Sequence, residues 1–146
     1  LLDTSAREDS AARRRERADA IVALEAGRFL GVTDRLLPQL IHQTHVHGPV
    51  GNQVKAMAAR VGRDAFIRQQ RAILGRGDSR DLLARITIPT AIGVGDTDVL
   101  TPPAEAEALN TAIAGSTLYT FAGCGHLPPL EKPGETSAFL RDWLVR

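Results

Sequence analysis

The chain has 146 residues, of which 43% are apolar and 24% are charged, so it is long enough for one globular domain and unlike a disordered chain. Eighteen basic against seventeen acidic residues give a net charge of +1, which argues against a nucleic-acid-binding protein. A single cysteine, Cys124, excludes an internal disulfide and an all-cysteine metal site. No apolar stretch is long enough to span a bilayer and no export signal opens the chain, so we expect a soluble, cytoplasmic protein with no membrane partner.

The first half of the chain is predicted to be helical. Residues 1–7 have the pattern of the end of a core strand followed by a loop, and residues 8–76 are rich in helix formers and in apolar residues at helical spacing. A phosphate- or nucleic-acid-binding site is one interpretation of the four arginines at positions 13, 14, 15 and 17. No aromatic residues interleave with them, so a solvated helix face is the favoured interpretation. Helices are expected at residues 12–26, 33–43, 52–61 and 64–74.

Residues 77–146 are predicted to form an α/β layer. A short, nearly uncharged run that follows Pro89 is typical of a buried parallel strand. Thr101 is expected to cap the helix that follows this strand. A strand, a helix, a strand and a final helix in this order imply a parallel sheet with a crossover connection. The elements are expected at residues 90–95, 101–114, 117–122 and 134–145, with a loop over 123–129. The last of these helices is expected to bury Phe139, Leu140, Trp143 and Leu144.

Two candidate catalytic residues follow the two predicted strands. Asp98 comes after the first strand and His126 comes after the second. Because ligands and reactive groups gather at the carboxyl ends of parallel strands, we expect the two side chains to meet there. An aspartate beside a histidine fixes its tautomer and stabilises the imidazolium formed during proton transfer. Spacing alone leaves alternatives open: Asp98 as a helix cap, Asp96 as the acid, or His126 as an ordinary loop residue.

The same two regions resemble known α/β-hydrolase-fold enzymes. The stretch IPTAIGVGDTDVLTPP at 88–103 is similar to the strand whose following aspartate is the acid of their catalytic triad. The stretch FAGCGHLPPLEKP at 121–133 is similar to their last active-site loop, which supplies the histidine. The resemblance therefore implies the C-terminal portion of such a fold, about three strands with flanking helices. It also implies a helical cap over residues 8–76, with Asp98 and His126 in catalytic roles.

The resemblance implies an esterase-like or enol-lactonase-like hydrolase of a small carboxylic ester or lactone, without a cofactor. The five serines do not include one in the G-x-S-x-G elbow that carries the nucleophile in these enzymes. The nucleophile is therefore expected upstream of Leu1, on a missing N-terminal half of the fold. The chain alone is expected to be inactive and either to bind that half or to form a homo-oligomer. A dehalogenase or epoxide hydrolase with an aspartate nucleophile, and a non-catalytic interaction module, are the alternatives.

Cys124 and a cluster of histidines are two further candidates for chemistry. Cys124 lies two residues before His126, but a small buried loop residue is the favoured interpretation of it. His42, His45 and His47 include a His-x-His pair, but no nearby carboxylate or cysteine completes a metal site, so no metal is expected.

Overall fold

A computed structural model describes residues 1–27, 29 and 31–145, and its second half is an α/β layer. Strands β1 (Ala91–Gly95) and β2 (Thr117–Phe121) pair in parallel, with Ala91 beside Thr117 and Gly95 beside Phe121. Helix α4 (Pro103–Ala112) connects them. The predicted α/β class, strand order and parallel pairing are confirmed.

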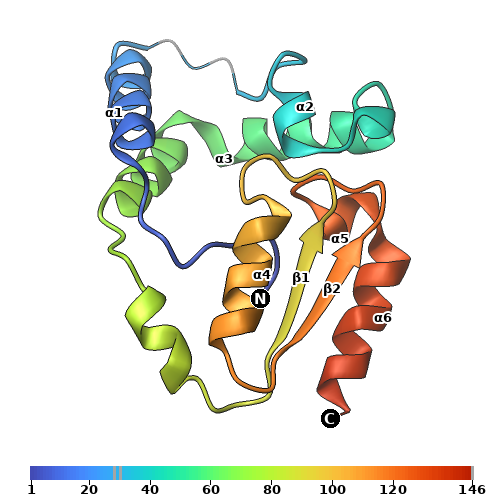
Figure 1. Cartoon of the computed structure of the whole chain (residues 1–146). Coiled ribbons are helices and arrows are strands. Elements are labelled where there is room, and N and C mark those ends of the chain that lie inside the picture. Colours follow the sequence, from blue (N-terminus) through green and yellow to red (C-terminus); the bar gives the residue numbers. More distant parts are fainter. Residues whose placement is uncertain (28, 30, 146) are drawn as a thin grey trace.

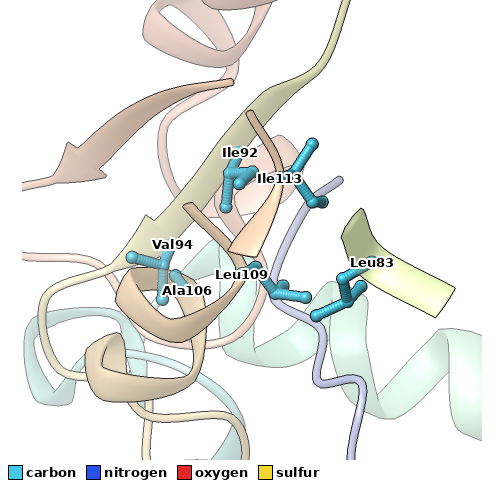
Figure 2. Close-up of a cluster of buried hydrophobic side chains, with 6 residues drawn as sticks. All are labelled: Leu83, Ile92, Val94, Ala106, Leu109 and Ile113. Atoms are coloured by element: carbon cyan, nitrogen blue, oxygen red, sulfur yellow. The ribbon is translucent and has the colours of Figure 1, made fainter. Parts of the chain in front are cut away.

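Strand β1 is the centre of this layer. All of its residues are buried, as expected for a parallel strand covered on both faces. Side chains alternate along a strand, so Ile92 and Val94 share the face that packs against α4. Figure 2 shows the buried cluster on this face, which consists of Leu83, Ile92, Val94, Ala106, Leu109 and Ile113.

The third expected strand is reduced to one bridge. Leu2 pairs in parallel with Gly93, on the side of β1 away from β2. The main chain then turns at Asp3, whose φ of 41° is incompatible with a continuing strand. The prediction of about three strands is therefore corrected to two strands and this single bridge.

Helix α6 (Pro133–Leu144) packs against β2 through Phe139, one of its two aromatic residues. The ring of Phe139 lies 5.8 Å from the rings of Tyr119 and Phe121, centroid to centroid. The other apolar residues expected to be buried on this helix are more open: Trp143 is 38% exposed, Leu140 is 40% exposed and Leu144 is 70% exposed. That expectation was wrong for them, because the two strands are too few to cover the whole apolar face of the helix.

The helical segment differs in detail from its prediction. The two helices expected at 52–61 and 64–74 both lie within α3 (Pro49–Leu74), and Gly62, at φ 72° and ψ 171°, breaks the helical backbone where the boundary between them was predicted. The helix expected at 33–43 shortens to α2 (Leu37–Leu40), because Ile41 takes an extended conformation and is buried. Helix α1 (Ala11–Glu25) begins at an N-cap serine, Ser10.

The helical segment lies beyond the carboxyl ends of the strands. Figure 1 shows α1, α2 and α3 on the side of the sheet to which β1 and β2 point. Three short helices were not predicted, namely η1 (Gln43–His45), η2 (Arg80–Arg85) and α5 (Pro128–Glu131). Among the described residues, no helix has the length and apolar character needed to cross a membrane.

Candidate active site

The loop after β1 presents one buried carboxylate. Asp98 is 3% exposed, and its Oδ1 accepts hydrogen bonds from the backbone N–H groups of Leu100 and Thr101 at 2.8 and 3.1 Å. The Thr101 hydroxyl donates to Oδ2 at 2.7 Å. The prediction that Thr101 is the N-cap of α4 is therefore wrong. Pro102 has that position, and Thr101 instead fixes the orientation of the Asp98 carboxylate.

The loop after β2 places its histidine on that carboxylate. His126 Nδ1 lies 2.8 Å from Asp98 Oδ2 and 3.3 Å from the Thr101 hydroxyl. The Asp98 side chain is fully buried, whereas the His126 side chain is 24% exposed. Among the described residues, no hydrogen bond engages Nε2 of His126. The structure therefore brings Asp98 and His126 together, as the sequence predicted. Nδ1 of the imidazole is hydrogen-bonded to Asp98, and Nε2 is available to other groups.

The two groups shift each other's pKa as an ion pair does. Burial raises the pKa of Asp98, but hydrogen bonds from His126 and Thr101 outweigh it, so the pKa is lowered. Burial lowers the pKa of His126, but the hydrogen bond and charge of Asp98 outweigh it, so the pKa is raised. A negative Asp98 thus favours the protonated imidazole, which is what an aspartate supporting a general base must do.

Asp96 is oriented toward the backbone of the second loop. Its carboxylate accepts hydrogen bonds from the N–H groups of Gly123 and Cys124 at 2.9 and 3.0 Å. Burial raises the pKa of Asp96, but these two hydrogen bonds make the net change a lowering. Of the two aspartates that the sequence left open, Asp98 contacts His126 and Asp96 ties together the loops that follow β1 and β2.

Glu131 on α5 holds the histidine loop from its other side. It is 6% exposed and accepts hydrogen bonds from the N–H groups of His42, Gly125 and Leu127 at 2.7 to 3.1 Å. The His126 N–H donates to the Leu40 carbonyl at 3.0 Å. The helical segment and α5 therefore fix the backbone on which the imidazole is mounted.

Known proteins resemble this arrangement over part of their length. No protein-family model matches the chain. A pimeloyl-acyl-carrier-protein methyl ester esterase from Neisseria meningitidis is 29% identical over 106 residues, which are 73% of this chain and 34% of the esterase. A solved thermophilic esterase from Thermogutta terrifontis superposes with a TM-score of 0.87 at 30% identity, covering 99% of this chain and 54% of the esterase.

The chain has the fold of the C-terminal part of an α/β-hydrolase. An enol-lactonase from Burkholderia xenovorans shares this fold, with a TM-score of 0.82 at 22% identity over 100% of this chain and 55% of the lactonase. The chain spans about a third of the curated esterase and about half of each solved enzyme.

Within this hydrolase fold, Cys124 is a packing residue. It is fully buried, and its Sγ lies 3.7 Å from Glu131 Oε1. Burial and the charge of Glu131 both raise its pKa, which disfavours the thiolate that a nucleophile requires. The interpretation of Cys124 as a small buried loop residue fits this geometry.

The histidines of the helical segment do not assemble a ligand set in the described residues. His42 Nδ1 bonds the Thr44 hydroxyl at 2.8 Å, and the His42 and His45 rings lie 6.5 Å apart, edge to face. The one group of three potential metal ligands in the described part of the chain is instead Asp3, Asp98 and His126.

Sequence reasoning missed Asp3, Thr101 and Glu131 as neighbours of the site. Glu131 meets His42 across 89 positions, and Asp3 meets Gly95 across 92. No local pattern encodes contacts between residues so far apart. Thr101 lies only three positions after Asp98, but it was interpreted as the cap of the following helix. A local signal exists for Glu131, which is a carboxylate directly after the apolar run LPPL at 127–130.

Proposed function

We propose that this chain is the acid–base half of an α/β-hydrolase that cleaves a small carboxylic ester or lactone. The observation that carries the proposal is the 2.8 Å hydrogen bond between His126 Nδ1 and the buried Asp98 carboxylate. The pair lies where parallel strands end, which is where such sheets place their reactive groups.

In this reaction, a hydroxyl nucleophile on a segment outside this chain attacks the substrate carbonyl. Its proton passes to Nε2 of His126, while Asp98 keeps the other proton on Nδ1 and stabilises the imidazolium. The C–O bond to the leaving group then breaks, and the leaving oxygen takes the proton from Nε2. Water repeats the cycle on the acyl-enzyme and releases the acid. None of the described serines hydrogen-bonds His126, which supports a nucleophile from outside.

We infer that residues 8–76 are the cap that shapes the substrate pocket. A cavity of about 520 Å³ has His126 and Asp3 on the sheet side and Arg13 and Gln70 on the helical side. A cap above the site excludes water from the reacting groups and selects substrates by shape. The esterases and the enol-lactonase that the chain resembles support the ester or lactone class.

The test compares p-nitrophenyl acetate hydrolysis by the 146-residue chain and by the longest product of its reading frame. The chain is expected to be inactive and the longer product active. In the longer product, His126→Ala is expected to lower kcat by at least about a thousandfold, since it removes the general acid and base. His47→Ala, on an exposed histidine, is the matched control and should leave kcat unchanged.

Two results would contradict the proposal. One is a longer product that folds and hydrolyses the ester equally well with and without His126. The other is hydrolysis by the 146-residue chain that His126→Ala abolishes, because a nucleophile would then have to lie within residues 1–146.

A further inference from the structure

Asp3 places a second carboxyl at the end of the sheet. Its N–H donates to the Gly93 carbonyl at 3.0 Å, continuing the parallel pairing that Leu2 begins. The next donor on β1, the N–H of Gly95, bonds the Asp3 Oδ1 at 3.0 Å. The side chain of Asp3 therefore takes the place of a main-chain acceptor, which fixes the carboxyl beside the end of β1.

The backbone of Asp3 is held in a disfavoured conformation. Its φ of 41° lies in the left-handed region, and among the described residues no other non-glycine residue has a positive φ. Such strain persists only where surrounding contacts enforce it, and it concentrates at functional sites. Here the contacts that enforce it are the two hydrogen bonds to β1, and their effect is to keep the carboxyl near the Asp98–His126 pair.

The three side chains form a compact cluster. One oxygen from each of Asp3 and Asp98 and one ring nitrogen of His126 all lie within 4.8 Å of one another. Two carboxylates this close repel each other when both are ionised. Burial raises the pKa of Asp3 to about 7, the Gly95 N–H opposes this rise, and the charge of Asp98 adds to it. Asp98, with its lowered pKa, keeps the negative charge while Asp3 holds a proton.

Other titratable groups around the cluster come from the loop after β2, from α5 and from the cavity that Asp3 and His126 share. The charged residues that line this cavity are Arg7, Glu8, Asp9, Arg13, Arg17, Arg76 and Glu105. The charge of Asp3 contributes to the raised pKa of Cys124, so the thiol also faces it. Glu131 adds to the negative potential at His126, as do Asp98 and Asp3. The charges that raise the pKa of His126 are thus all those of acids.

We propose that Asp3 is a positioning residue of this acid–base site, and that loss of its proton strengthens the hold of the site on the proton of His126. When Asp3 is neutral, Asp98 is the one charged carboxylate of the cluster. When Asp3 is ionised, both carboxylates are negative and both attract the proton of the imidazole. The chemical consequence rests on the proposed function, because the imidazolium forms when the nucleophile gives up its proton. The titration itself requires neither substrate nor nucleophile.

The test is an NMR titration of the full 146-residue chain in three forms: wild type, Asp3→Asn and Glu8→Gln. In the wild type, the Asp3 carboxyl carbon is expected to titrate near pH 7 and not near its ordinary 3.8. The His126 ring protons, assigned by their loss in His126→Gln, should report a lower pKa in Asp3→Asn than in the wild type. Glu8→Gln removes one charge from an exposed residue of the same cavity and should leave His126 unchanged.

The asparagine keeps an oxygen for the Gly95 N–H, so a purely structural role for Asp3 predicts equal His126 titrations in wild type and Asp3→Asn. That equality would overturn the proposal, and so would a wild-type Asp3 carboxyl that completes its titration near pH 4. If Asp3→Asn does not fold, the wild-type carboxyl titration decides alone. Failure of the proposed function would appear differently, as ester hydrolysis that does not depend on His126.

Discussion

The carboxylates at the end of the sheet and those of the helical segment have different hydrogen-bond partners. At the end of the sheet, Asp96 and Glu131 accept hydrogen bonds from main-chain N–H groups, and Asp98 accepts them from main-chain N–H groups and from His126. In the helical segment, Glu25 instead pairs with Arg71, and both side chains are about half exposed. Backbone donors fix position, whereas exposed ion pairs add little stability. We therefore expect substitutions in the loops of the site to destabilise the fold more than substitutions on the surface of the helical segment.

The largest effect is expected where the two site loops touch. A Cβ on Gly95 would lie 2.0 Å from the Gly125 carbonyl oxygen and 2.4 Å from that of Cys124, and both are backbone atoms. Gly95→Ala should therefore lower the free energy of unfolding by at least about 4 kcal/mol, measured by urea denaturation. Gly134→Ala is the control, since nothing lies within 4 Å of its Cβ. Equal stability of the two variants would show that the loops are not in close contact.

A smaller loss is expected from the carboxylate that supports the histidine loop. In Glu131→Gln, an NH₂ group replaces one of the two acceptor oxygens. Because this group donates and does not accept, some of the backbone N–H groups that bond Glu131 lose their partner. The expected cost is about 3 kcal/mol in the same denaturation experiment. Glu107→Gln, on an exposed position of α4, should cost almost nothing. A Glu131→Gln variant as stable as the wild type would mean that the second acceptor oxygen of Glu131 does not stabilise the histidine loop.

The smallest effect is expected on the helical surface. Glu25→Gln breaks the ion pair with Arg71 but leaves no buried group without a partner. The loss should be at most about 0.5 kcal/mol and should vanish in high salt. A loss as large as that of Glu131→Gln would remove the distinction between the two regions.

The sequence predicted the α/β half better than the helical half, for physical reasons. The buried run of β1 and the residues after each strand are local signals, so Asp98 and His126 could be placed from them. Spacing alone left open which of Asp96 and Asp98 faces the histidine, because that choice depends on the N–H groups of Gly123 and Cys124, and the resemblance to α/β-hydrolases was needed to choose Asp98. The helix expected at 33–43 was too long, because burial of Ile41 overrides its local helical pattern.

The most direct test of the account is the tautomer of His126, read from ¹⁵N NMR of the 146-residue chain. Because Nδ1 lies 2.8 Å from Asp98 Oδ2, the neutral ring is expected to carry its proton on Nδ1 and to leave Nε2 free. The spectrum should be recorded at a pH above the raised pKa of His126, where the ring is neutral. A proton on Nδ1 in the wild type supports Asp98 as the residue that orients the base. A neutral ring protonated on Nε2 would contradict the account, because that nitrogen could not accept a proton from a nucleophile.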